Sequence, residues 1–196
     1  MSKSGLVYLD TSVIVAVLLN EDRAEDTVEV LESFKNGVAE CVISPLVIAE
    51  IYGTPKIREV TRSGMTPSLA KKSALDSIRR VDKFLGHLES WDACILVENT
   101  RRQGVMVRDF GLRYQLKGPD AMHLAAAIEF GCSHLFTFDR GLLKVGNEQG
   151  VEVSQPYLLD VSNSSASDSG DTAAPEGSTD PPAFLSVIPG LSTYLQ

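Results

Sequence analysis

The sequence is short of the residues that build disulfide frameworks, zinc sites and membrane helices. It has only three cysteines, which lie far apart and form no Cys-x-x-Cys pair, and His87 and His134 show no ligand spacing. The cysteines are therefore typical of small core residues in a reducing compartment. No apolar run approaches the roughly 18 residues of a membrane helix, and the short polar start does not resemble a signal peptide. We expect a cytoplasmic protein without a membrane segment.

Basic residues are missing from the end of the chain. From Asp160 onward there are five acidic residues and no lysine or arginine, in a stretch rich in Ser, Asp, Gly, Ala and Pro. Such a composition cannot bury enough apolar surface to offset the entropy of ordering. We predict one folded domain over residues 1–160, a disordered linker over 161–182 and a short hydrophobic segment over 183–196. That segment is either a docking element or an apolar terminus without a role.

The net charge of -8 conceals a basic segment in the middle of the chain. Residues 56–83 hold eight basic and three acidic residues. A solvated helix face explains this pattern, and contact with a phosphate backbone is the alternative. An acidic total does not exclude a nucleic-acid substrate when a local basic surface is present.

Apolar periodicity predicts alternating strands and helices. Strands are expected at 6–9, 41–43, 93–97, 134–138 and 151–153, and helices at 12–19, 23–34, 45–52, 67–85, 100–115, 120–130 and 141–145. Ser44 is expected to cap its helix, and residues 117–119 are expected to form a turn. This alternation favours a three-layer α/β/α fold, with a central mostly parallel sheet and helices on both faces. Ligands of such folds bind at the carboxyl ends of the strands.

Four acidic residues lie within apolar sequence: Asp10, Glu50, Asp120 and Asp139. Asp10 and Asp139 follow predicted strands, and the other two lie on helices that can point to the same edge of the sheet. A buried carboxylate must be paired or bound to a metal, and clustered carboxylates raise one another's pKa unless a cation neutralises them. Oxygen ligands favour Mg²⁺ or Mn²⁺ over zinc. The pattern therefore predicts one acidic metal site assembled from four segments.

Each of these acids also has a purely structural interpretation. Asp10 and Asp120 can be helix N-caps, Asp139 can be a turn residue, and Glu50 can pair with an arginine. One shared site explains all four acids at once, whereas the structural interpretation needs four independent coincidences. The single site is therefore favoured. His123 lies one helical turn after Asp120 and can reach that site, but a satisfied, partly buried histidine is the favoured interpretation.

The sequence resembles the PIN-domain nucleases, in particular the VapC-like ribonuclease toxins. The matching segments occur in the family's order over roughly residues 5–155: Tyr8-Leu-Asp-Thr-Ser, Ser44-Pro-Leu-Val-Ile-Ala-Glu, Pro119-Asp-Ala-Met-His-Leu-Ala-Ala-Ala and Leu135-Phe-Thr-Phe-Asp-Arg-Gly-Leu. The resemblance implies that the four acids are the family's metal-binding residues, with a hydroxyl from Thr11 or Ser12 beside the first. It also implies an RNA substrate, a protein antitoxin and a homodimer.

The expected activity is hydrolysis of RNA phosphodiester bonds with Mg²⁺ or Mn²⁺, which activates water and stabilises developing charge. Asp10 and Asp120 are expected to bind the ion directly, Asp139 directly or through water, and Glu50 to act as ligand or base. Arg140 either holds the scissile phosphate or pairs with an acid.

Other functions fit less well. A haloacid-dehalogenase-like phosphatase needs a second aspartate where this chain has Ser12. A housekeeping or structure-specific PIN nuclease and a non-catalytic RNA-binding scaffold remain the alternatives.

Overall fold

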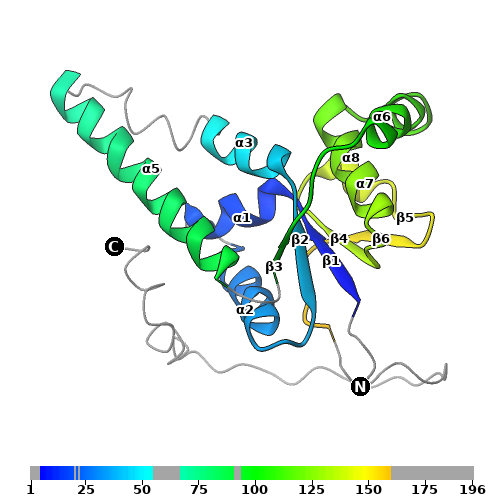
Figure 1. The fold of residues 1–196 in the computed structure, drawn as a ribbon, viewed down its shortest axis with the longest axis horizontal. Helices are drawn as coiled ribbons and strands as arrows, with labels where there is room; N and C mark the ends of the chain where they lie inside the picture. Colours follow the sequence, from blue (N-terminus) through cyan, green and yellow to red (C-terminus); the bar gives the residue numbers. More distant parts are fainter. Residues whose placement is uncertain (1–4, 20, 22, 55–66, 91–93, 160–196) are drawn as a thin grey trace.

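The fold is built on a six-stranded sheet with the strand order β3-β2-β1-β4-β6-β5 (Figure 1). The computed structural model describes residues 5–19, 21, 23–54, 67–90 and 94–159. The predicted linker (161–182), the hydrophobic segment (183–196) and residues 56–66 of the basic segment lie outside these ranges. The elements are, in order, β1 (Leu6–Leu9), α1 (Thr11–Leu18), α2 (Ala24–Lys35), β2 (Glu40–Ile43), α3 (Pro45–Gly53), α5 (Pro67–Glu89), β3 (Cys94–Leu96), α6 (Arg101–Tyr114), α7 (Gly118–Glu129), β4 (His134–Phe136), α8 (Arg140–Leu143), β5 (Asn147–Glu148) and β6 (Val151–Ser154).

The strands run parallel except for β5, so their carboxyl ends meet at one edge of the sheet. β1 pairs in parallel with β2 on one side and with β4 on the other, and β5 pairs antiparallel with β6. Helices α1, α2 and α5 lie on one side of the sheet, and α6 and α7 lie on the other (Figure 1). The predicted three-layer α/β/α architecture with a mostly parallel sheet is confirmed.

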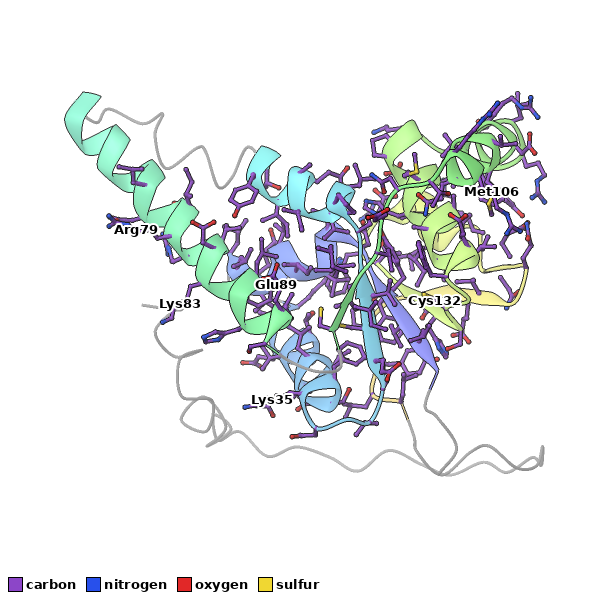
Figure 2. All side chains as sticks on the ribbon, viewed as in Figure 1. Lys35, Arg79, Lys83, Glu89, Met106 and Cys132 are labelled. Atoms are coloured by element: carbon purple, nitrogen blue, oxygen red, sulfur yellow. The ribbon has the colours of Figure 1, made fainter. Side chains whose placement is uncertain are left out.

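The core lies on both faces of β1. Val7, Tyr8 and Leu9 are fully buried, as expected for a central parallel strand covered by helices on both sides. On one side, α7 presents buried Leu124 and four buried alanines, whose small side chains allow a close approach to the sheet. Figure 2 shows side chains filling the space between the layers, and Cys132, labelled there, is among the buried residues. All three cysteines are free.

Two features of local structure differ from the prediction. The expected turn at residues 117–119 is wrong: Lys117 is the N-cap of α7, and Gly118 and Pro119 are its first residues, because proline suits the first turn of a helix. Asp120 therefore lies in the first turn and is not the cap. Ser44 is the N-cap residue of α3, but its side chain makes no capping hydrogen bond.

Several boundaries also move. α5 runs on to Glu89, and its labelled Arg79 and Lys83 point outward from the helix (Figure 2). The two-residue strand β5 was not expected, because it is too short to show a period. Among the described helices, none is long and apolar enough to cross a membrane.

Glu148 of β5 ties the end of α6 to the edge of the sheet. Its carboxylate accepts a hydrogen bond from Arg113 (Nη2 to Oε1, 2.7 Å) and another from the Tyr114 hydroxyl. These hydrogen bonds, first that of Tyr114 and then that of Arg113, hold the pKa of Glu148 below its ordinary value although burial opposes them. A lowered pKa means that the carboxylate stabilises the fold above pH 4–5 and that this contribution is lost as the pH falls.

We expect Glu148→Gln to lower the Tm at pH 7 by roughly 2–4 °C, because the amide accepts these hydrogen bonds less strongly than the carboxylate. The difference from the native protein should shrink as the pH falls through the lowered pKa of Glu148, because Glu148 itself then becomes protonated. Thermal unfolding followed by circular dichroism between pH 3.5 and 7 measures both effects. Glu29→Gln, at an exposed position of α2, is the control. A loss of Tm that does not shrink at any acidic pH at which the protein remains folded would contradict the assignment.

Candidate functional site

The four acids of the sequence motifs line one cleft at the carboxyl edge of the sheet. Asp10 follows β1, Asp139 follows β4, Glu50 lies on α3, and Asp120 lies in the first turn of α7. The cleft has a volume of about 560 Å³. Its lining is completed by Thr11, Ser12, Val15, Ala49, Gly53, Thr54 and His123. The residues that the sequence associates with one site thus share one cavity.

Asp10 is the most buried of the four acids, with 4% of its surface exposed. Its Oδ1 accepts the backbone N–H of Thr11 at 2.7 Å, so Asp10 does cap α1. Its Oδ2 accepts hydrogen bonds from the hydroxyls of Ser12 and Thr137, both at 2.6 Å. The two roles are compatible, because the capping carboxylate also faces the cleft. Three donors offset the cost of burying its charge.

Glu50 is joined to Asp10 through His123. The His123 Nε2 atom lies 2.9 Å from Oε2 of Glu50 and 3.2 Å from Oδ1 of Asp10. The Thr11 hydroxyl also donates to Oε2 of Glu50, at 2.6 Å. Burial would raise the pKa of Glu50, but the hydrogen bonds from His123 and Thr11 outweigh it and lower the pKa. No arginine is needed to pair with Glu50, because a histidine takes that place.

The pKa of His123 is raised by the same contacts. Burial alone would lower it, because 1% of the residue is exposed, but the hydrogen bond to Glu50 and the charge of Asp10 outweigh this effect. The favoured interpretation of His123, a satisfied histidine, is therefore compatible with a place in the site. The sequence alone does not show whether a single histidine on an apolar helix is a satisfied buried residue or a member of the site.

Asp120 and Asp139 occupy the other side of the cleft. The pKa of Asp120 is raised, first by burial and then by the negative charges of Asp139 and Asp10. Asp139 also caps a helix: its Oδ1 accepts the backbone N–H groups of Gly141 (2.6 Å) and Leu142 (3.1 Å) at the start of α8. Arg140 is exposed beside it. Repulsion among the clustered carboxylates thus contributes to the raised pKa of Asp120. The pKa of Glu50 is lowered instead, because His123 donates to its carboxylate.

The donor set fits a divalent cation. Asp10, Glu50 and His123 each offer a ligand atom, and these atoms lie within 4.8 Å of one another. Asp120 and Asp139 line the same cleft and add negative charge without joining this closest group. The arrangement differs from the expected all-oxygen site in two respects: an imidazole nitrogen belongs to the closest group, and the expected ligands Asp120 and Asp139 do not.

Thr137 is the site residue that the sequence did not single out. It is fully buried, donates to Asp10 and accepts the backbone N–H of Asp139 at 2.9 Å. Ser12 makes a similar link, because its hydroxyl accepts the backbone N–H of Phe138 at 2.9 Å. The signal was a polar residue inside the apolar segment Leu135-Phe-Thr-Phe, the same kind of signal that marks Asp10.

The family can be read from a comparison with known domains. The family model described as the PIN domain matches residues 7–148, which is most of the chain. The chain belongs to the PIN-domain family. No curated protein matches it.

Two solved PIN-fold structures are similar to this PIN domain at 14% sequence identity. One is the toxin VapC20 of Mycobacterium tuberculosis, described as cleaving the sarcin-ricin loop; the match has a TM-score of 0.50 and covers 73% of this chain and 97% of that one. The other is VapBC2 of Rickettsia felis, bound to a DNA fragment from its promoter; the TM-score is 0.52, with 76% and 98% covered. At this identity the likeness concerns the fold.

We expect Thr137→Val to destabilise the metal-free PIN domain by about 1–3 kcal/mol, because it removes a donor to the buried carboxylate of Asp10 and the acceptor of the Asp139 N–H. Urea unfolding in the presence of a chelator measures the effect. Thr27→Val is the matched control: Thr27 is also fully buried, but its hydroxyl bonds only to the backbone oxygen of Arg23 within the helical segment. An equal loss in both variants would contradict the role given to Thr137.

Proposed function

We propose that this PIN-domain protein is a metal-dependent endoribonuclease that hydrolyses RNA phosphodiester bonds. The observation that carries the proposal is the gathering of Asp10, Glu50, Asp120 and Asp139 in one open cleft. A divalent ion bound there, Mg²⁺ or Mn²⁺, supplies Lewis-acid chemistry that activates water and stabilises charge on the phosphate. The proposed metal ligands are Asp10, Asp120 and Asp139, with Glu50 as a further ligand or as the base.

The residues around the acids have supporting roles in this proposal. Thr11 and Ser12 orient the carboxylates of Glu50 and Asp10 by donating their hydroxyls. Arg140 at the rim is exposed and offers a positive charge to a phosphate of the substrate. The raised pKa of Asp120 supports the need for a cation, because its carboxylate is destabilised first by burial and then by neighbouring negative charge.

We infer further that the protein is the toxin of a type II toxin–antitoxin pair. The fold that it shares with VapC20 and with VapBC2 supports this assignment. Its activity would then be held in check by a protein antitoxin, one segment of which occupies the cleft near the acids. A homodimer is the expected assembly.

One observation favours a second candidate, an RNA-binding domain without turnover. His123 already pairs with Glu50 and Asp10, so these two acids have a partner without a metal. A housekeeping or structure-specific PIN nuclease is the third possibility. Cleavage that requires a divalent ion rejects the scaffold, and the set of RNAs that are cut separates a toxin from the others.

We expect Asp10→Asn to lower the rate of RNA cleavage by about 1,000-fold or more, because metal chemistry contributes several kcal/mol to such reactions. Purified protein with Mg²⁺ or Mn²⁺ and a mixture of cellular RNAs, followed by sequencing of the new 5′ ends, measures the rate and the cleavage sites. Cleavage by the native protein should stop when a chelator is added and return with excess Mn²⁺.

Asp109→Asn is the matched control, because Asp109 is an exposed aspartate of α6 whose carboxylate pairs with Arg108. It should cut RNA at the native rate. A folded Asp10→Asn protein that cuts RNA as fast as the native one would overturn the nuclease assignment. Expression of the native protein, but not of the Asp10→Asn protein, should arrest growth if the protein is a toxin.

A further inference from the structure

One edge of the His123 imidazole faces the two carboxylates at the centre of the cleft. Its Nε2 atom is 2.9 Å from Oε2 of Glu50 and 3.2 Å from Oδ1 of Asp10. Neighbouring ligand atoms around an octahedral ion such as Mg²⁺ are about 3.0 Å apart. The two distances from Nε2 therefore match the spacing of neighbouring ligands, and all three ligand atoms lie within 4.8 Å of one another. A hydrogen bond from Nε2 would have the same spacing. A histidine ligand also needs a partner for its other ring nitrogen.

The other edge of the ring meets a buried hydroxyl chain. The Nδ1 atom of His123 lies 3.0 Å from the Tyr8 hydroxyl, which lies 2.7 Å from Oγ of Ser44. Tyr8 and Ser44 are both fully buried. A histidine that binds a metal through one nitrogen donates the N–H of the other to a fixed acceptor. The Tyr8 oxygen can accept that N–H while its own hydrogen is donated to Ser44.

One further observation shows that the hydrogen-bonded chain of His123, Tyr8 and Ser44 has a cost to local structure. Ser44 stands at the N-cap of α3 but makes no capping hydrogen bond with its side chain, and its hydroxyl faces Tyr8 instead. Helix α3 therefore lacks the stabilisation that a side-chain cap normally provides.

We propose that His123 binds the divalent ion of this site directly through Nε2, and that Tyr8 and Ser44 orient the ring for that role. The inference rests on the ion-binding part of the proposed function. His123 is the sole nitrogen ligand among the side chains that line the cleft in the described part of the chain. Mg²⁺ takes oxygen ligands, whereas affinity for imidazole rises along the first-row transition series. The site should therefore bind Mn²⁺ at least about 10-fold more tightly than Mg²⁺.

Pulsed electron paramagnetic resonance of Mn²⁺ bound to the full-length protein tests the nitrogen ligand without a substitution. We expect a hyperfine coupling from a directly bound ¹⁴N nucleus, replaced by a ¹⁵N coupling when histidine alone is labelled with ¹⁵N. The chain has three histidines, so single variants identify the source. The coupling should persist in His87→Gln and in His134→Gln and disappear in His123→Gln.

The outcomes separate this proposal from the nuclease assignment. Bound Mn²⁺ without a nitrogen coupling overturns the role of His123, and the nuclease assignment stands if the same sample cuts RNA. A nitrogen coupling in a protein that cuts no RNA supports the ligand and overturns the nuclease. Failure of Mn²⁺ to bind at all overturns both.

Tyr8→Phe tests the orienting role, because it keeps the aromatic ring and removes only the hydroxyl. We expect the affinity for Mn²⁺ to fall by about 10–100-fold, as for other partners of a ligating histidine, while the nitrogen coupling remains. Isothermal titration calorimetry measures the affinity. Tyr157→Phe is the control, since its hydroxyl contacts Glu152 at the surface. An unchanged Mn²⁺ affinity in Tyr8→Phe would refute the role of Tyr8.

Discussion

A carboxylate can be buried only where donors or cations replace the water that it loses, and Asp10 obeys this constraint. Its oxygens are held by the first N–H of α1 and by hydroxyls from Ser12 and Thr137, and the ring of His123 faces Oδ1. These groups come from α1, from the segment after β4, and from α7. The buried carboxylate of Asp10 needs all of these donors, so it constrains how three parts of the fold are arranged around it.

Structural and functional roles coincide in these acids. Asp10 caps α1 and Asp139 caps α8, yet both line the cleft. A carboxylate has two oxygens, and at Asp139 one of them, Oδ1, is enough to satisfy the helix terminus. The capping hydrogen bonds fix the side chain and so reduce the entropy that an ion would otherwise have to remove. Interpreting such a residue as a cap does not argue against its interpretation as a ligand.

The sequence was sufficient for features that depend on neighbouring residues and not for those that depend on distant ones. The strand at Leu6–Leu9 and the acid that follows it are visible in a few residues, because burial gives a continuous apolar run. The contacts of His123 with Tyr8 and of Thr137 with Asp10 join residues 115 and 127 positions apart, so no local pattern announces them. The turn predicted at Gly118-Pro119 is wrong because the same dipeptide occurs both in turns and in the first turn of a helix.

The order of strands in the sheet also determines when the cleft comes into existence. β4 lies between β1 and β6, and the segment that follows it carries Thr137 and Asp139, whereas Asp10 is supplied near the start of the chain. During translation, a nascent polypeptide that has not yet released β4 from the ribosome lacks one wall of the cavity. Translation therefore has to pass Asp139 before the cavity can close around any ion or polynucleotide.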